Sequence, residues 1–282
     1  MINGIPNYYR QFGYAFALAM GGGRRGPRSA LPSLPDGRDE PVRVSPATPD
    51  DLAFIAATAE VASRRLLLCP QRDAALWRYE IDGRSESNIF RRSWRVIKTA
   101  DGQPIGYLAH APRFRDSTRW LSHFELAPGE SWLAVTPSVL RQLAAMESDG
   151  PPAEQVGLWL GLDHPAYHVL PRSLPIVDAP DAWYVRVPDT ISFLRHIAPL
   201  LEARLADSVA RGFSGELRLN QFHDGVVLRF DAGRLAAVEP WERPDARAGD
   251  ASLPADCLAQ LLCGYRSLAE LTAADPDCTV ST

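Results

Sequence analysis

Lysine is almost missing from this sequence: Lys98 is the only one among 30 basic residues, so arginine supplies nearly all of the positive charge. Together with 24 prolines, this bias is typical of a GC-rich coding sequence. Adaptation to heat usually enriches Lys and Glu instead. The chain also has no excess of positive charge, since its formal net charge is −4. This excludes a general binding surface for nucleic acids or anionic membranes.

Cysteines and long apolar runs are also scarce. Four cysteines in 282 residues do not form the disulfide scaffold of a small secreted domain. No run approaches the roughly 18 apolar residues that a membrane span needs. The apolar stretch Phe12–Met20 is as long as the core of a signal peptide, but Pro6, Tyr8 and Tyr9 crowd its start and no small-x-small cleavage site follows. A cytoplasmic protein is therefore expected.

Hydrophobic residues make up 46% of the chain and charged residues 23%, which is ordinary for folded proteins. The length favours two domains. An aromatic and apolar segment covers 1–20, and a Gly/Pro/Arg-rich stretch over 21–41 is predicted to be an extended linker. A domain over 42–188 and a second over 189–282 follow.

The first of these domains alternates strand and helix patterns. Thr48 and Pro49 are typical of a helix start, and Asp101-Gly102 between two apolar runs is typical of a hairpin. The patterns predict strands over 42–44, 93–100, 103–111, 119–126, 155–162 and 182–187, with helices over 52–65, 72–81, 136–147 and 164–170. This order predicts an α/β fold.

The remainder has a different order. One long helix over 189–210 precedes three short strands over 215–222, 225–230 and 234–240, and helices over 254–263 and 267–271 follow. A long helix on a small antiparallel sheet indicates a separate α+β unit.

Three segments carry a family resemblance. Residues 4–14 (GIPNYYRQFGY) resemble the Tyr-x-x-Phe-Gly-Tyr run that ends a GNAT acetyltransferase domain. The pattern over 42–188 resembles a further GNAT domain. Residues 213–219 (FSGELRL), 233–241 (GRLAAVEPW) and 258–271 resemble a sterol-carrier-protein-like domain. This order is similar to the layout of the Eis-like (enhanced intracellular survival) acetyltransferases.

The resemblance implies an N-acetyltransferase that moves the acetyl group of acetyl-CoA to an amine on a small molecule or peptide. In that family the tyrosine of the run protonates the departing thiolate, and Tyr9 matches it. The C-terminal carboxylate acts as a base, a role that Thr282 matches by position only. The resemblance also implies a homo-oligomer, and the negative net charge predicts no nucleic-acid partner.

The motif that holds the coenzyme pyrophosphate does not match. It needs Arg/Gln-x-x-Gly-x-Gly/Ala at a helix start, and only eight residues precede Tyr9. In the 42–188 domain, residues 127–131 (APGES) offer one glycine and an acid. We therefore expect 1–20 to be the remnant of a truncated first GNAT domain and 42–188 to be non-catalytic. A late start, a fragment or a decayed gene would each give such an incomplete or inactive version. The alternative is a non-catalytic lipid-binding or oligomerisation module.

Two other groups of residues are weaker candidates. His164 and His168 have the i, i+4 spacing of a metal pair, but no third ligand follows at a recognisable spacing, so a surface or capping role is expected. Cys257 and Cys263 are expected to be buried thiols. No metal is predicted.

Overall fold

The computed structural model describes residues 1–5, 7–66, 68–114, 117–147, 151–242, 244–245 and 248–281. The chain forms two compact units. Residues 20–181 make the first, called the central unit here. The terminal unit combines residues 1–19 with 182–282. No helix of the described residues is both long and apolar enough to cross a membrane.

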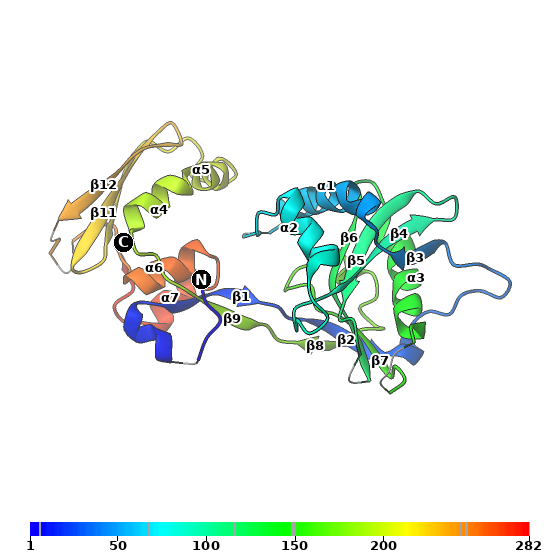
Figure 1. The fold of residues 1–282 in the computed structure, drawn as a ribbon. Helices are drawn as coiled ribbons and strands as arrows, with labels where there is room; N and C mark the ends of the chain where they lie inside the picture. Colours follow the sequence, from blue (N-terminus) through cyan, green and yellow to red (C-terminus); the bar gives the residue numbers. More distant parts are fainter. Residues whose placement is uncertain are drawn as a thin grey trace. The chain divides into compact units, whose positions relative to one another are not determined.

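A seven-stranded sheet of order β3-β4-β5-β6-β7-β2-β8 organises the central unit (Figure 1). Its neighbours are antiparallel except for β6 and β7, which run parallel. The strands are β2 (Gly23–Pro27), β3 (Val42–Pro46), β4 (Ser93–Thr99), β5 (Pro104–His110), β6 (Thr118–Leu126), β7 (Gln155–Leu158) and β8 (Ile176–Asp178). The helices are η2 (Arg28–Ala30), η3 (Pro49–Asp51), α1 (Leu52–Ser63), α2 (Ala74–Arg78), η4 (Tyr79–Gly83), α3 (Trp132–Ala145) and η5 (Pro165–His168).

Helices cover both faces of this sheet. Alternation along β4 and β5 sends Ile97 and Leu108 into a large core with α3, whereas Val96 and Tyr107 point to a smaller core with α1 and α2. The start of α1 follows the predicted signal: Thr48 and Asp51 form a capping box around Pro49. The predicted strands 42–44, 93–100, 103–111 and 119–126 are confirmed, and so is the α/β fold.

The linker predicted over 21–41 is wrong in its first part, because Gly23–Pro27 forms β2 between β7 and β8. A Cβ atom on Gly23 would collide with the carbonyl oxygen of Leu158, and one on Gly26 with that of Ser173. These positions require glycine, so the segment has no apolar pattern that would predict a strand.

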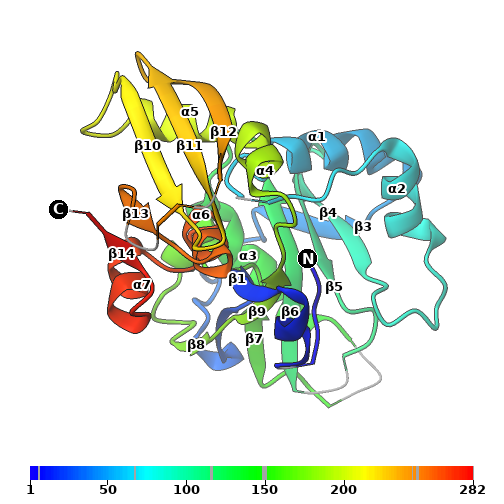
Figure 2. The ribbon, with the colours of Figure 1, turned by 90° about the vertical axis from the view of Figure 1, so that its left-hand side faces the viewer.

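The terminal unit contains a five-stranded sheet of order β12-β11-β10-β13-β14 and a two-stranded pair of β1 with β9. Figure 2 shows the β10–β12 meander with α4 and α5 beside it. The strands are β1 (Ala15–Met20), β9 (Asp181–Val185), β10 (Gly215–Asn220), β11 (Asp224–Asp231), β12 (Arg234–Glu242), β13 (Ala251–Ser252) and β14 (Thr279–Val280). The helices are η1 (Tyr8–Phe12), α4 (Thr190–His196), α5 (Ala198–Ala206), α6 (Ala255–Leu262) and α7 (Leu268–Ala274).

Two expectations about this region need correction. The single helix predicted over 189–210 is broken at Ile197 into α4 and α5, because Pro199 cannot donate to the preceding turn. The strand predicted over 182–187 to close the 42–188 domain is β9, which pairs with β1 in the terminal unit. The predicted strands of the β10–β12 meander are confirmed.

Candidate functional site

An opening lies between β6 and β7 in the central unit. The parallel ladder joins the two strands from Thr118 to Leu121, while β6 continues to Leu126. Beyond Leu121, β6 stays paired with β5 on one edge, while its other edge borders the opening rather than β7. Backbone groups in such a place must be paired by side chains, water or a ligand.

His164 occupies this opening. Its side chain is only 4% exposed, and its Nε2 lies 2.9 Å from the carbonyl oxygen of Phe124 on β6. Its Nδ1 accepts a hydrogen bond of 3.2 Å from the Ala166 amide, which places the ring proton on Nε2, facing Phe124. The indole of Trp132 packs edge-on against the imidazole, with ring centroids 5.0 Å apart. Tyr167 lies next to His164, and its hydroxyl accepts a hydrogen bond of 3.0 Å from the Leu160 amide.

Two amides in and just after the loop between β6 and α3 are paired locally. The Glu130 amide donates to the Ala127 carbonyl at 3.2 Å, and the Ala134 amide donates to the cap oxygen of Ser131 at 3.3 Å. Gly129 supplies the left-handed conformation of the turn, with a φ of 89°. The carboxylate of Glu130 disfavours an anion at this helix start, where a phosphate would otherwise be attracted.

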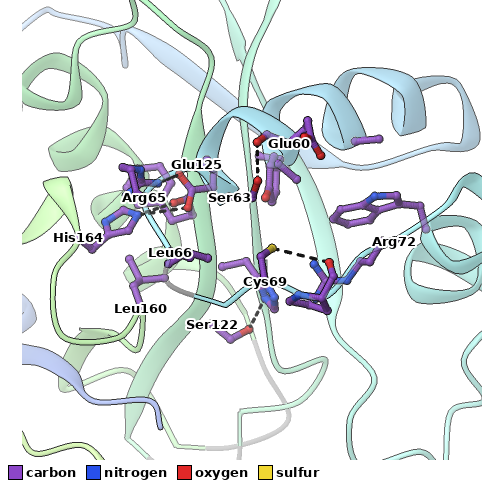
Figure 3. A pocket seen from close by; sticks show the side chains of 18 of the residues that line it. Glu60, Ser63, Arg65, Leu66, Cys69, Arg72, Ser122, Glu125, Leu160 and His164 are labelled. Atoms are coloured by element: carbon purple, nitrogen blue, oxygen red, sulfur yellow. Dashed lines mark hydrogen bonds and ion pairs between the residues drawn. The ribbon is translucent and has the colours of Figure 1, made fainter. Parts of the chain in front are cut away.

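A cavity of about 530 Å³ lies beside the opening, between α1 with its following loop and the far half of β6. In Figure 3, Arg65, Glu125 and His164 point toward one another on one side, and Cys69 and Arg72 lie on the other. Arg65 forms an ion pair with Glu125, and His164 Nε2 is 3.6 Å from a Glu125 oxygen. The lining therefore mixes paired charges with apolar surface.

Burial controls the electrostatics of the inner wall. The pKa of His123 is lowered to about 4, first by burial and then by the charges of Arg72 and Arg92. Burial raises the pKa of Tyr107 well above its ordinary value, and the Glu125 carboxylate adds to the effect. Both side chains are therefore neutral near pH 7, and neither is tuned to exchange a proton there.

A second cavity, of about 490 Å³, lies in the terminal unit. Its lining comes from the segment around Tyr14 and from α6 and α7, and it carries both arginines and acids. The lining residues are Arg10, Gly13, Tyr14, Ala15, Phe16, Ala255, Asp256, Cys257, Gln260, Arg266, Leu271, Ala274 and Asp275.

Tyr9, the candidate proton donor, lies on η1 in the terminal unit. Its ring packs against the rings of Tyr184 and Tyr14, with centroids 5.7 Å and 6.1 Å away. Gly4 lies so close that a Cβ there would collide with the Tyr9 ring. These contacts fix the orientation of the phenol. The other candidate, Thr282, lies outside the described residues.

The two histidines of the 163–168 segment do not converge. His168 is 80% exposed and sits near Asp163, whereas His164 is buried against β6 and caps η5. The predicted capping role of His164 is confirmed. The sequence did not predict that His164 fills the opening.

The sequence also did not predict that Asp275 and Cys278 lie close to Cys257. The only hint of this cluster in the sequence is the short spacing between Asp275 and Cys278.

No protein-family model matches the chain, and no curated protein sequence matches it. Solved structures do. A GCN5-related N-acetyltransferase from Anabaena variabilis superposes with a TM-score of 0.65 at 15% identity, covering 100% of this chain and 66% of that one. A conserved protein of unknown function from Enterococcus faecalis, a probable N-acyltransferase, gives 0.63 at 13% identity, covering 97% and 64%.

The fold is therefore that of the GCN5-related N-acetyltransferases. Eis1 from Mycobacterium abscessus is among the similar structures, with a TM-score of 0.54 at 17% identity over 99% of this chain and 66% of that one. The chain thus spans about two thirds of the length of these structures, and at such identities the likeness concerns the fold.

Proposed function

We propose that this chain is part of an N-acetyltransferase with the layout of the Eis-like enzymes. The observation that carries the proposal is the superposition of nearly the whole chain on N-acetyltransferase structures, at coverages of 97–100%. The reaction joins the acetyl carbon to the nitrogen of an amine on a small molecule or peptide. The carbon–sulfur bond of acetyl-CoA breaks, the thiolate takes a proton, and the amine loses one.

We propose that the central unit does not hold acetyl-CoA. A coenzyme with its phosphates at the start of α3 would extend along the adjoining half of β6. That opening is filled by His164 and Trp132, and the loop before α3 carries Glu130. The residues present do not fit the coenzyme, so its site is proposed to lie outside this unit.

Tyr9 is proposed as the proton donor to the thiolate, and the carboxylate of Thr282 as the base for the amine. Support for Tyr9 comes from its place in the Tyr-x-x-Phe-Gly-Tyr run and from the close packing of its ring by Tyr184 and Gly4. A phenol whose ring is held in one orientation can be aimed at a leaving group.

The test is acetyl-CoA-dependent thiol release with a panel of amines, on protein expressed from the whole reading frame that contains this sequence. Replacing Tyr9 by Phe should lower kcat on the order of 100-fold, the usual contribution of a positioned acid. The matched control is Tyr8→Phe, since this neighbouring ring is 50% exposed. Equal rates for the two variants would contradict the role of Tyr9.

The coenzyme location has its own test. A Glu130→Lys variant adds positive charge at the start of α3 without removing a side-chain hydrogen bond or ion pair that the described residues show. If the coenzyme binds elsewhere, the KM for acetyl-CoA stays unchanged. A clear fall in that KM would place the coenzyme in the central unit and refute this part of the proposal.

Self-association is proposed as well, because Tyr8 and Phe12 on η1 expose 50% and 49% of their surface. Light scattering should give a multiple of the 31.0 kDa chain mass. A monomer mass over a tenfold concentration range would contradict it.

A further inference from the structure

Three ligand-type side chains, one from α6 and two from the turn between α7 and β14, converge in the terminal unit. Cys257 lies in the first turn of α6, Asp275 ends α7, and Cys278 immediately precedes β14. One ligand atom from each lies within 4.8 Å of the others. The two cysteines expose 5% and 2% of their surface. Asp275 itself is half-buried, so its carboxylate meets two buried thiols at the edge of the core.

The distance between the Cys257 sulfur and an Asp275 oxygen fits a tetrahedral metal ion. Sulfur and oxygen ligands bind zinc at about 2.3 Å and 2.0 Å, so a tetrahedral pair lies about 3.5 Å apart. Cys257 Sγ and Asp275 Oδ2 are 3.5 Å apart. Without metal, the Cys257 thiol donates a hydrogen bond over this same distance. The Cys278 thiol also contacts the Cys257 thiol, so the cluster offers three metal ligands and not only one hydrogen-bonded pair.

The surroundings orient the carboxylate. Asp275 Oδ1 accepts a hydrogen bond of 2.9 Å from the Asp277 amide, which leaves Oδ2 turned to the thiols. The Cys278 amide donates to the Asp275 carbonyl at 3.0 Å, so the two ligands share one tight turn. Outer contacts that fix a ligand's orientation in this way are usual around metal ions.

The second cavity gives access to the cluster. Cys257 and Asp275 both line it, together with Asp256. Arg10 and Arg266 also line it and balance the two acids, so the wall is close to neutral. Two thiolates and one carboxylate carry three negative charges, so a divalent cation bound by them would leave one negative charge facing a wall that also holds Arg10 and Arg266. A water molecule from the cavity can supply a fourth ligand.

We propose that Cys257, Asp275 and Cys278 form a binding site for one divalent, thiolate-preferring metal ion of the zinc class. Soft sulfur ligands favour zinc over magnesium or calcium. The ion would join α6, the end of α7 and the start of the C-terminal strand, three segments that are otherwise held by packing and short ladders.

Binding must release protons. Burial is the main cause that raises the pKa values of the Cys257 and Cys278 thiols, and nearby carboxylates add to it. Both thiols are therefore protonated near pH 7 without metal, and each must lose its proton to become a ligand. The apparent affinity should rise roughly 100-fold per pH unit, the slope expected for two displaced protons.

The experiment is a titration of the reduced chain with Co(II) as a spectroscopic substitute for zinc. One equivalent should give thiolate-to-cobalt charge-transfer absorption and tetrahedral d–d bands, and zinc should displace it. Cys278→Ser should lose about half of the charge-transfer intensity, and Asp275→Asn should weaken binding at least tenfold. The matched control is Cys263→Ser, because Cys263 lies on the end of α6 outside the cluster. It should bind like the parent.

Several results would each overturn the proposal. One is the absence of charge-transfer absorption at saturating Co(II) in the folded parent. Another is a spectrum that survives unchanged in both Cys278→Ser and Asp275→Asn. A Cys257–Cys278 disulfide that persists in reducing buffer and blocks cobalt uptake would also overturn it. Circular dichroism of each variant confirms that a lost signal does not come from unfolding.

Discussion

Replacing His164 by alanine should destabilise the central unit strongly. The substitution removes a ring that is 4% exposed and packed against Trp132, which costs about 2 kcal/mol by analogy with other large-to-small changes in cores. It also leaves the Phe124 carbonyl without its 2.9 Å partner, which adds about 1 kcal/mol. The sum of about 3 kcal/mol corresponds to a Tm lower by roughly 6–12 °C in a unit of this size.

Two further variants separate the two contributions. His164→Gln keeps an N–H group that can reach the Phe124 carbonyl, so it should recover about 1 kcal/mol of the loss. His168→Ala removes the other histidine of the same segment, which is 80% exposed, and should change stability by no more than about 0.5 kcal/mol.

Thermal and urea unfolding followed by tryptophan fluorescence measure these effects, because Trp132 reports directly on the opening. Equal stability of His164→Ala and His168→Ala would refute the reasoning. It would mean that the imidazole does not fill the space between β6 and β7.

Three other expectations concern the central unit. The pKa of His123 is lowered from 6.5 to about 4 in the folded state, so the unfolded state binds the proton at a higher pH than the folded state does. The free energy of unfolding should therefore fall as the pH drops from about 6.5 to 4. In acid denaturation, His123→Gln should make this dependence on pH less steep. Glu40→Gln breaks the bidentate pair with Arg141, at 2.8 and 2.6 Å, and should cost at most about 1 kcal/mol while speeding proteolysis over residues 31–39. Gly26→Ala should prevent β2 from pairing with its neighbouring strands, because the added Cβ would collide with a backbone oxygen. Gly37→Ala should destabilise the fold by only about 1 kcal/mol, the strain of a φ of 73°. Unfolding curves of the two variants measure this difference.

Much of the fold could be predicted because its signals are local. Thr48, Pro49 and Asp51 place the start of the first helix, and Asp101-Gly102 joins β4 to β5 as expected. Alternating apolar residues mark strands with one or two buried faces. Such signals need no knowledge of distant partners.

The features that the sequence did not predict depend instead on contacts between distant parts of the chain. β2 consists of Gly, Arg and Pro residues, and its place is set by neighbouring backbones that leave no room for side chains at Gly23 and Gly26. The i, i+4 histidine spacing assumes an α-helix, but Pro165 begins a short 3-10 turn that separates His164 from His168. Cys257 and Cys278 are brought together by tertiary structure, which spacing along the chain does not reveal.

The proposed metal site and the proposed base are coupled through the chain. Thr282 follows Cys278 by four residues in the sequence, so an ion held by Cys278 would restrain the segment that leads to the proposed base. If both proposals hold, a chelator should lower kcat for acetyl transfer, and zinc should restore it. Cys278→Ser should reproduce the loss without chelator, while Cys263→Ser should not. A kcat that is unchanged by chelation, in a protein shown to bind cobalt, would contradict this coupling and leave the metal site and the base as separate proposals.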